Sequence, residues 1–239
     1  NTALILAANN GHQELAALLR EAGAPVDHHE AAAIGDTEHV RSILDRNPEL
    51  LDSFSTEGFT ALGLAAHFGH LDTMRLLLDR GADVSVVSRH PIGATPLIAA
   101  LFGRRVEAAR ILIERGADVQ RARGGKGWPR AGWTPLHYAA AFGFPEIVSL
   151  LLERGASVDA RDDSGATPLE VAREASREDI ARLLLGQAAR TEQLSPSSAR
   201  AEPSEEAPSS GARRAPSSPR EERGERARRR GARALRKDS

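Results

Sequence analysis

Apolar residues in this chain gather in short clusters that recur at a regular interval. Residues 65–84, 99–119 and 139–158 each run in the same order through an alanine pair, a glycine, an aliphatic stretch and a Gly-Ala dipeptide. Paired alanines let neighbouring helices approach closely, and the aliphatic stretch supplies one apolar face of a second helix. A glycine between the two segments permits a tight turn. The pattern therefore predicts stacked pairs of short helices. The turn glycines are Gly69, Gly103 and Gly143.

A threonine stands before each predicted helix pair from residue 60 onward. Successive threonines lie 35, 39 and 33 residues apart, and the last three are followed by proline. A threonine hydroxyl can accept a hydrogen bond from an unpaired N–H at a helix start, and proline at the first helical position lacks only a donor without a partner. A glycine then marks the helix end, where it adopts the left-handed conformation. The starts are Thr60, Thr95-Pro96, Thr134-Pro135 and Thr167-Pro168, and the ends are Gly81, Gly116 and Gly155.

The order of these landmarks resembles that of ankyrin-repeat proteins. The resemblance implies an all-α solenoid of about six stacked helix-turn-helix repeats joined by β-hairpin loops, because the landmarks recur near that family's period. It also implies that His137 has a structural, hydrogen-bonding role. The matching stretches are Gly132-Trp133-Thr134-Pro135-Leu136-His137, Gly69-His70 and Gly81-Ala82-Asp83-Val84. The expected repeats are residues 1–24, 25–55, 56–88, 89–122, 123–160 and 161–186.

Both ends of the expected solenoid depart from the repeat pattern. Nothing precedes the first helix of the first repeat, which suggests that residues upstream of Asn1 are missing. The second repeat lacks the Thr-Pro-Leu element, and its second helix is expected to stop near Asn47-Pro48. The last repeat carries polar residues at Arg177-Glu178-Asp179, so we expect it to cap the solenoid.

The repeat pattern stops at Gln187, and the composition changes with it. Residues 187–239 are rich in Ser, Pro, Arg and Glu, with 13 basic and 8 acidic side chains against 19 and 25 in residues 1–186. Such a segment buries too little apolar surface to offset its ordering entropy, so we expect a disordered basic tail. The tail could fold back on the acidic repeats, reach an anionic partner, or simply remain solvated.

Composition excludes several classes of protein. The 239 residues include no cysteine, which excludes disulfides and cysteine-ligated metals. No apolar run approaches the length of a membrane span, and no signal peptide is visible. Only 4% of the residues are aromatic, so alanine and leucine must supply most of the core. We expect a cytoplasmic, monomeric chain.

The chain shows no constellation of residues for catalysis. His29-Glu30 begins like the helix of a zinc protease, but the second histidine of that motif is replaced by Ala33. No Gly-x-Ser-x-Gly nucleophile elbow occurs. Asp162-Asp163 lies between repeats, where adjacent carboxylates form turns more often than acid/base pairs. The sequence therefore predicts no enzyme activity, no metal and no cofactor.

An enlarged loop at residues 122–133 is a candidate contact surface. Its sequence, ARGGKGWPRAGW, resembles a phosphate loop, but that loop needs Ser or Thr after the lysine, and Gly127 follows Lys126. The loop instead accounts for the 39-residue step between threonines. Tryptophan with arginine is typical of protein-interface hot spots, and it also suits nucleic acid, which the acidic repeats disfavour. The candidate residues are Arg121, Arg123, Lys126, Trp128, Arg130 and Trp133.

A phenylalanine precedes the turn glycine in three consecutive repeats, at Phe68, Phe102 and Phe142. These rings either pack between helices or form a partly exposed stripe along the concave surface that solenoids use for binding. The leading interpretation is a non-catalytic protein–protein interaction module with a protein partner. Two alternatives remain open. The chain could be the regulatory or targeting part of a larger enzyme, or it could bind anions through the tail and the 122–133 loop.

Overall fold

The computed structural model describes residue 18, residues 26–124 and residues 129–194. Within these residues the regular elements are ten α-helices and one 3₁₀ helix, and no β-strand is formed. In chain order they are α3 (His28–Ile34), α4 (Thr37–Arg46), η1 (Pro48–Leu50), α5 (Ala61–Phe68), α6 (Leu71–Asp79), α7 (Pro96–Phe102), α8 (Val106–Glu114), α9 (Pro135–Phe142), α10 (Pro145–Glu153), α11 (Pro168–Glu174) and α12 (Glu178–Leu194).

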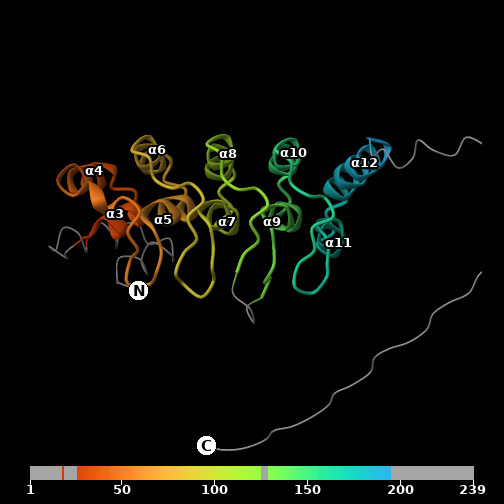
Figure 1. The fold of residues 1–239 in the computed structure, drawn as a ribbon, viewed down its shortest axis with the longest axis horizontal. Coiled ribbons are helices and arrows are strands. Elements are labelled where there is room, and N and C mark those ends of the chain that lie inside the picture. The colour runs from red at the N-terminus through yellow and green to blue at the C-terminus, as the bar shows by residue number, and fades with distance from the viewer. Residues whose placement is uncertain (1–17, 19–25, 125–128, 195–239) are drawn as a thin grey trace, which may run out of the picture. The chain divides into compact units, whose positions relative to one another are not determined.

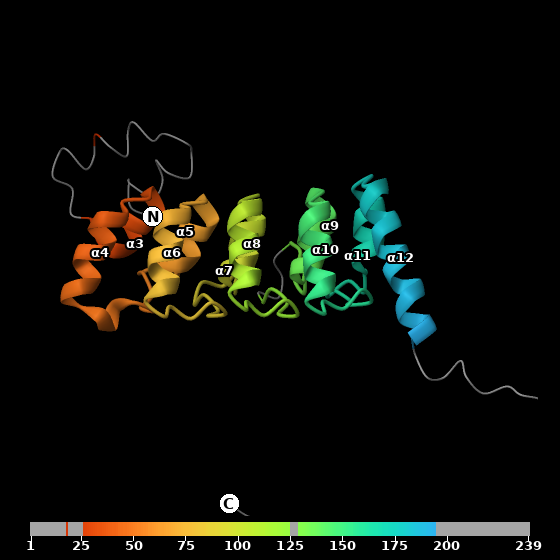
Figure 2. The same ribbon diagram turned by 90° about the horizontal axis from the view of Figure 1, so that it is seen from above.

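The helices form two rows that run along the repeat region (Figure 1). The inner row consists of α3, α5, α7, α9 and α11, and the loops between repeats extend below it. The outer row consists of α4, α6, α8, α10 and α12, which lie side by side when the molecule is seen from above (Figure 2). This arrangement is the predicted all-α solenoid, built from five described helix pairs.

Threonine is the N-cap of the inner helices α5, α7, α9 and α11, whereas Asp27 caps α3. The Thr60 and Thr95 hydroxyls accept hydrogen bonds from the backbone N–H groups of Gly63 at 3.2 Å and Ile98 at 3.3 Å. Pro96, Pro135 and Pro168 are the first residues of α7, α9 and α11. These caps satisfy donors that no helical carbonyl can reach, so the repeat boundaries are set by local sequence.

Small side chains hold the two rows together. Many alanines of the inner helices are completely buried, and a leucine from each of α5, α7 and α9 is at most 1% exposed. Because an alanine adds only a methyl group, the inner helices approach closely enough for side chains of one repeat to reach the backbone of the next. The buried alanines include Ala65, Ala66, Ala100, Ala139 and Ala140, and the leucines are Leu62, Leu97 and Leu136.

In the turn between the two helices of a repeat, one residue adopts the left-handed backbone conformation, but this residue is not always the glycine. Gly69 and Gly143 have φ of 81°. Gly103 has φ of −73°, and the left-handed residue there is Arg104, with φ of 57°. Gly103 therefore belongs to the turn without being its left-handed residue. Glycine is needed there for space, because a Cβ would lie 2.1 Å from the His67 carbonyl oxygen.

The loops between repeats are closed by a few backbone hydrogen bonds. Ser88 donates to Ala94 at 2.9 Å, and Arg123 donates to Trp133 at 2.8 Å. Neighbouring loops are joined as well, since the Arg89 N–H donates to the Gly58 carbonyl at 2.8 Å. The expected β-hairpins are therefore short turns of hairpin type, without strands among the described residues.

The ends of the repeat region differ in how well the sequence predicts them. Helix α4 ends at Arg46, directly before Asn47-Pro48, as expected. Helix α12 continues to Leu194, so the expected disordered tail does not begin at Gln187. Residues 187–194 include Gln, Ala, Arg, Glu and Leu, whose helix propensity extends a helix without an apolar face. Most of the first repeat, 1–24, and the tail from residue 195 lie outside the described residues.

Candidate protein-binding groove

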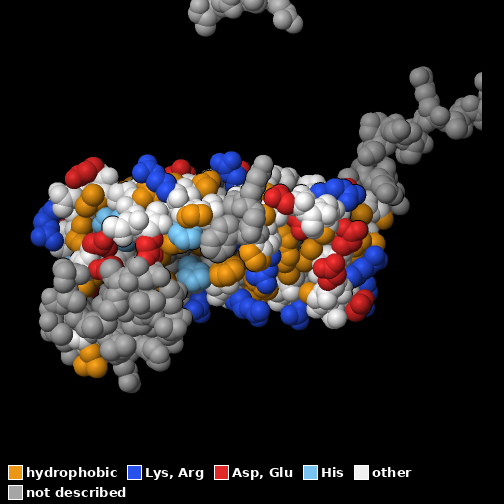
Figure 3. Space-filling view, turned by 90° about the horizontal axis from the view of Figure 1, so that it is seen from below, with side chains coloured by type: hydrophobic (Ala, Val, Ile, Leu, Met, Phe, Trp, Pro, Cys, Tyr) orange, Lys and Arg blue, Asp and Glu red, His pale blue; other side chains and the backbone are white. Residues whose placement is uncertain are grey.

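An apolar cavity of about 190 Å³ lies on the inner side of the repeats, between α5, α7 and the loops that precede them. Figure 3 shows this side of the molecule, where hydrophobic surface alternates with histidine and charged side chains. The cavity depends on three consecutive repeats, since Tyr138 of α9 closes one end. Its apolar side chains include Phe59, Leu64, Phe68, Ile92, Ile98 and Phe102.

The three phenylalanines of the predicted stripe have different surroundings. Phe68 is half-buried, and Phe102 is 46% exposed despite its size. Both line the cavity, and the His67 ring lies between them, with centroids 4.9 Å from Phe68 and 6.0 Å from Phe102. Phe142 does not line the cavity, although its ring lies 6.0 Å from that of Tyr138. Phe68 and Phe102 therefore share the cavity, whereas Phe142 lies beside Tyr138, which is fully buried.

His67 lines the cavity as a neutral side chain, together with the charged residues Glu57 and Arg123. Burial lowers its pKa, and its Nδ1 lies 3.2 Å from the carbonyl oxygen of Ala99. A carbonyl can only accept, so Nδ1 carries the proton of the neutral ring. Near neutral pH the cavity thus has a neutral imidazole between two phenylalanine rings, which suits an apolar side chain.

The Arg123 side chain forms hydrogen bonds inside the protein. Its side chain is buried, and its guanidinium donates to the carbonyl oxygens of Ile92 at 3.2 Å and Pro129 at 2.5 Å and to the Tyr138 hydroxyl at 3.4 Å. The sequence suggests a charge presented to a partner, but the structure places Arg123 in the lining of the cavity, with its N–H groups engaged by these acceptors. Arg123 therefore supports the loop and offers no free charge.

The other residues expected in the 122–133 loop divide into three groups. Arg121 and Arg130 are exposed. Trp133 is half-buried, with its Nε1 donating to Asp162 Oδ2 at 2.9 Å and its ring edge-on to Tyr138 at 5.1 Å. Lys126 and Trp128 lie outside the described residues. The described part of the loop thus offers Arg130 and one face of Trp133 beside the inner helices.

An arginine–aromatic cluster lies next to the cavity. The guanidinium carbon of Arg104 lies 4.8 Å from the centre of the Phe142 ring, and that of Arg130 lies 5.1 Å from the same ring. Arg130 also lies 5.1 Å from the centre of the Trp133 ring. Sequence reasoning did not single out Arg104. Its place directly after Phe102-Gly103 was the available signal.

His137 links two repeats by hydrogen bonds. Its Nδ1 lies 3.2 Å from the Thr134 N–H and 2.8 Å from the Thr134 hydroxyl, and its Nε2 lies 3.0 Å from the carbonyl oxygen of Ala166. Nε2 therefore carries the proton, because a carbonyl only accepts. The ring is fully buried, and burial lowers its pKa. Such a side chain holds the next loop in place and has no access to a substrate.

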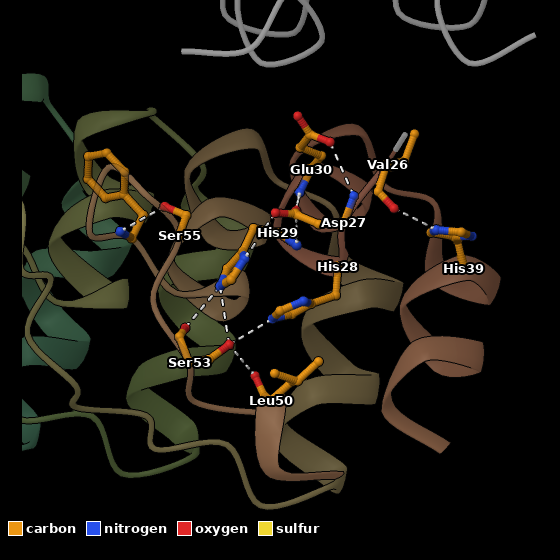
Figure 4. A network of polar contacts seen from close by, with 10 residues as sticks. Val26, Asp27, His28, His29, Glu30, His39, Leu50, Ser53 and Ser55 are labelled. Atoms are coloured by element: carbon orange, nitrogen blue, oxygen red, sulfur yellow. Dashed lines mark hydrogen bonds and ion pairs between the residues drawn. The ribbon is translucent and has the colours of Figure 1, made fainter. Parts of the chain in front are cut away.

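A second polar network surrounds the start of α3, where Asp27 caps the helix (Figure 4). Asp27, His29 and Ser53 are the residue types of a hydrolytic triad. However, His29 Nε2 donates to the Ser53 carbonyl at 3.0 Å, and the Ser53 hydroxyl donates to the Leu50 carbonyl at 2.7 Å. His28 Nε2 lies 2.9 Å from the same hydroxyl, whose proton is already given to the Leu50 carbonyl, so the network ties the loop to α3.

Two further kinds of site can be assessed in the described part of the chain. No group of three or more His, Asp or Glu side chains is placed to hold a metal ion there. No helix in the same residues has the length and apolar character needed to cross a membrane. The candidate site is therefore the apolar cavity together with the surface of α5, α7 and α9 around it, which is called the groove below.

Three family models match this chain. One described as ankyrin repeats (3 copies) matches residues 28–123 and 125–193, and one described as ankyrin repeats (many copies) matches residues 97–152. A third, described as ankyrin repeat, matches residues 1–29. The chain belongs to the ankyrin-repeat family. The match to residues 1–29 adds an ankyrin repeat in the region before α3.

Curated ankyrin-repeat relatives are much longer than this chain. The chain is 31% identical over 194 residues to the transient receptor potential cation channel subfamily A member 1 homolog of Caenorhabditis elegans, covering 77% of this chain and 15% of the relative. It is 34% identical over 178 residues to ankyrin repeat and SOCS box protein 3 of Homo sapiens, covering 70% and 33%. It is 41% identical over 139 residues to the E3 ubiquitin-protein ligase Ufd4 of Drosophila melanogaster, covering 58% and 4%. The chain thus spans about a third or less of these relatives.

Proposed function

We propose that this ankyrin-repeat chain is a non-catalytic interaction module that binds a segment of another protein in the groove along α5, α7 and α9. The observation that carries the proposal is the exposure of Phe102, a large apolar side chain on an inner helix, at the rim of an apolar cavity. Exposed aromatic side chains beside an apolar pocket are typical of protein contact sites.

Family membership supports the same function. Ankyrin repeats are typical protein-interaction modules, and solenoids bind along the concave surface built from successive repeats. Phe68, Phe102 and Tyr138 come from three successive inner helices, so a partner segment that lies along the groove would contact all three repeats. The fold leaves the partner's identity open, and the side chains of the groove must decide it.

The test is a selection of binding peptides followed by substitution at the cavity. A displayed library of random peptides of about a dozen residues is panned against the chain, and the affinities of recovered peptides are measured by fluorescence anisotropy. Phe102→Ala is expected to weaken binding by about tenfold or more, since an anchor residue contributes more than about 1 kcal/mol. Because Phe102 is half exposed, its removal should change the melting temperature little.

Leu183→Ala is the matched control. Leu183 on α12 is 42% exposed, and like Phe102 it is a large apolar residue at the surface, but it lies away from the cavity. The control should bind as the wild type does. Recovery of no binding peptide, or equal affinity for the Phe102→Ala and wild-type chains, would contradict the proposed groove.

A second candidate function is favoured by the relatives. Several are named as enzymes, among them the ubiquitin ligase of Drosophila and a tyrosine-protein kinase, HTK16, of Hydra vulgaris, and the chain covers 4% and 16% of these two. We propose as an alternative that the groove serves as the regulatory or targeting part of a larger enzyme. The complete reading frame tests this idea, because it must then encode a catalytic domain.

A further inference from the structure

Two residues with an unfavourable backbone conformation converge on one aromatic ring. Among the described residues other than glycine, positive φ occurs at Arg104, Arg130 and Ser176. The first two, from different repeats, both place their guanidinium groups over Phe142, at 4.8 and 5.1 Å from the ring centre. A residue with a Cβ is strained in the left-handed region, and such strain is concentrated at functional sites. The strained backbone at Arg104 and Arg130 therefore indicates that these two side chains have a role of their own.

Other repeats form the same turn without a strained residue. Corresponding turns use glycine at Gly69 and Gly143, with φ of 81°, whereas the turn after α11 has Ser176 with φ of 56°. At the turn after α7, Gly103 is required by the nearby His67 carbonyl, so the left-handed position moves to the next residue. A second glycine there would satisfy the backbone, but the chain has Arg104. The chain thus keeps an arginine at a position where glycine would be less strained.

The charges of Arg104 and Arg130 are not neutralised within the described part of the chain. Some exposed arginines there form ion pairs, as Arg110 does with Glu107 and Arg115 does with Asp79, while others such as Arg105 and Arg121 do not. Neither Arg104 nor Arg130 lies within ion-pair distance of a described carboxylate. A guanidinium that stacks on an aromatic face keeps its N–H groups free at the edge, where they match the oxygens of a carboxylate.

Acidic groups near the two arginines are not paired with them among the described residues. Asp162 accepts hydrogen bonds from Trp133 Nε1, the Ser164 N–H and hydroxyl, and the Ala166 N–H, at 2.6 to 2.9 Å. Its charge is thus compensated within its own loop. Glu57 lines the cavity at the opposite end of the groove, two repeats before Phe142. Asp163 and Glu174 line the same surface as Arg130, but no ion pair joins either carboxylate to Arg130 among the described residues. The end of the groove near Phe142 thus carries two arginines that form no ion pair with a described carboxylate.

The cluster is continuous with the apolar cavity. Tyr138 lines the cavity, and its ring lies 6.0 Å from that of Phe142. Phe102 at the cavity rim stands two residues before Arg104. A bound segment that fills the cavity with an apolar side chain would therefore bring a neighbouring side chain to the two arginines.

We infer that Arg104 and Arg130, held over Phe142, bind a carboxylate side chain of the partner, so that the partner is a short acidic segment with an apolar anchor residue. This inference rests on the proposed function of the groove and specifies the chemistry of its occupant. Charge complementarity selects the acidic segment, and the apolar cavity selects the anchor.

The peptide selection described above tests this inference separately from the proposed function. Peptides recovered on the wild-type chain should carry Asp or Glu within a few residues of a bulky apolar residue. Selection on the Arg104→Glu/Arg130→Glu chain should lose that acidic preference and favour Lys or Arg. An Arg182→Glu chain, altered on α12 away from the groove, should recover the wild-type pattern.

The outcomes are distinguishable. If the recovered peptides depend on Phe102 but show no acidic preference and bind the double variant as tightly as the wild type, the arginine inference is overturned and the groove stands. If no peptide is recovered on the wild-type chain, the proposed function of the groove is contradicted. If binding appears only after the peptides are phosphorylated on serine, the carboxylate assignment is overturned.

Glycine substitutions give a second test that a purely structural role would not pass. The Arg104→Gly/Arg130→Gly chain removes both guanidinium groups and relieves the backbone strain at both positions. It should melt at the wild-type temperature or above it, while its affinity for an acidic peptide falls by about tenfold or more. A lower melting temperature with unchanged affinity would show that the arginines only stabilise the fold and would overturn the inference.

Discussion

The Nε of Arg105 donates a hydrogen bond of 3.3 Å to the carbonyl oxygen of His67, across the junction between two repeats. The same relationship recurs at 2.9 Å between His70 and Ala33, and at 3.4 Å between Arg177 and Ala141. Each acceptor belongs to the last turn of an inner helix, where carbonyls have no helical partner. The residue after the turn thus joins each repeat to the one before it. Phe144 occupies this position in the fifth repeat and packs against Phe142 instead.

Replacing Gly69 should cost more stability than replacing a glycine of similar backbone conformation elsewhere. Gly69 has φ of 81°, and a Cβ there would lie 2.8 Å from Cδ of Arg105. Gly81 has φ of 88° with no atom within 4 Å of such a Cβ. We expect Gly81→Ala to reduce the free energy of unfolding by about 1 kcal/mol, and Gly69→Ala by about 2–3 kcal/mol. Urea denaturation of both variants measures the difference, and equal losses would contradict the junction described above.

Gly103 should tolerate substitution poorly for a steric reason alone. Its φ of −73° is ordinary for any residue, but a Cβ would lie 2.1 Å from the His67 carbonyl oxygen. We expect Gly103→Ala to reduce the free energy of unfolding by about 3 kcal/mol, because α5 and α7 must separate. Gly186→Ala in α12 is the control, since a Cβ there meets no atom within 4 Å. It should stabilise the chain by roughly 0.5–1 kcal/mol, and denaturation curves that fail to show opposite signs would contradict this account.

Stability should fall in mild acid because buried histidines are neutral in the folded chain. Burial and the neighbouring His29 lower the pKa of His28 from 6.5 to about 4. Between these values the unfolded chain binds more protons, so stability is complete above about pH 6.5 and is lost as pH falls toward 4. His28 alone should contribute a loss of about 2 kcal/mol at pH 5. Burial lowers the pKa of three other histidines in the same direction, namely His67, His70 and His137.

Urea denaturation at pH 7.5 and pH 5 measures this dependence. The His28→Gln chain should lose less stability than the wild type over the same interval, because one of the titrating groups is gone. An unchanged difference between the two pH values would show that His28 is not responsible. Asp27 titrates lower, since its hydrogen bond with His29 is the main cause that brings its pKa from 3.8 to about 2. Its contribution is present above about pH 3.8 and should not affect the result at pH 5.

The two arginines at the start of the enlarged loop should behave differently. Arg123 is buried with three hydrogen-bond acceptors, whereas Arg121 is exposed. We expect Arg123→Ala to reduce the free energy of unfolding by about 2–3 kcal/mol, since it leaves buried acceptors without a donor. Arg121→Ala should change it by less than about 0.5 kcal/mol. Thermal melts of the two variants compare them directly, and similar melting temperatures would contradict a structural role for Arg123.

The local sequence alone determined the succession of helices. Threonine and proline caps, turn glycines and alanine pairs act on neighbours within a few positions, so Thr95-Pro96 and Gly116 could be interpreted without coordinates. The structural role of His137 followed from its motif in the same way. The sequence predicted only part of the cavity lining. Phe68 and Phe102 each precede a turn glycine at the repeat period, whereas Phe59 and Ile92 lie in loops that show no repeated pattern.

Only the tertiary structure decided how residues about one repeat apart meet. Gly103 is glycine because of the carbonyl of His67, and Arg123 is buried because the carbonyls of Ile92 and Pro129 converge on it. The approach of Arg104 and Arg130 to Phe142 likewise joins separate repeats. Such contacts depend on the rotation and spacing between stacked repeats. That geometry arises from the packing of whole helices against one another, and no short stretch of sequence encodes it.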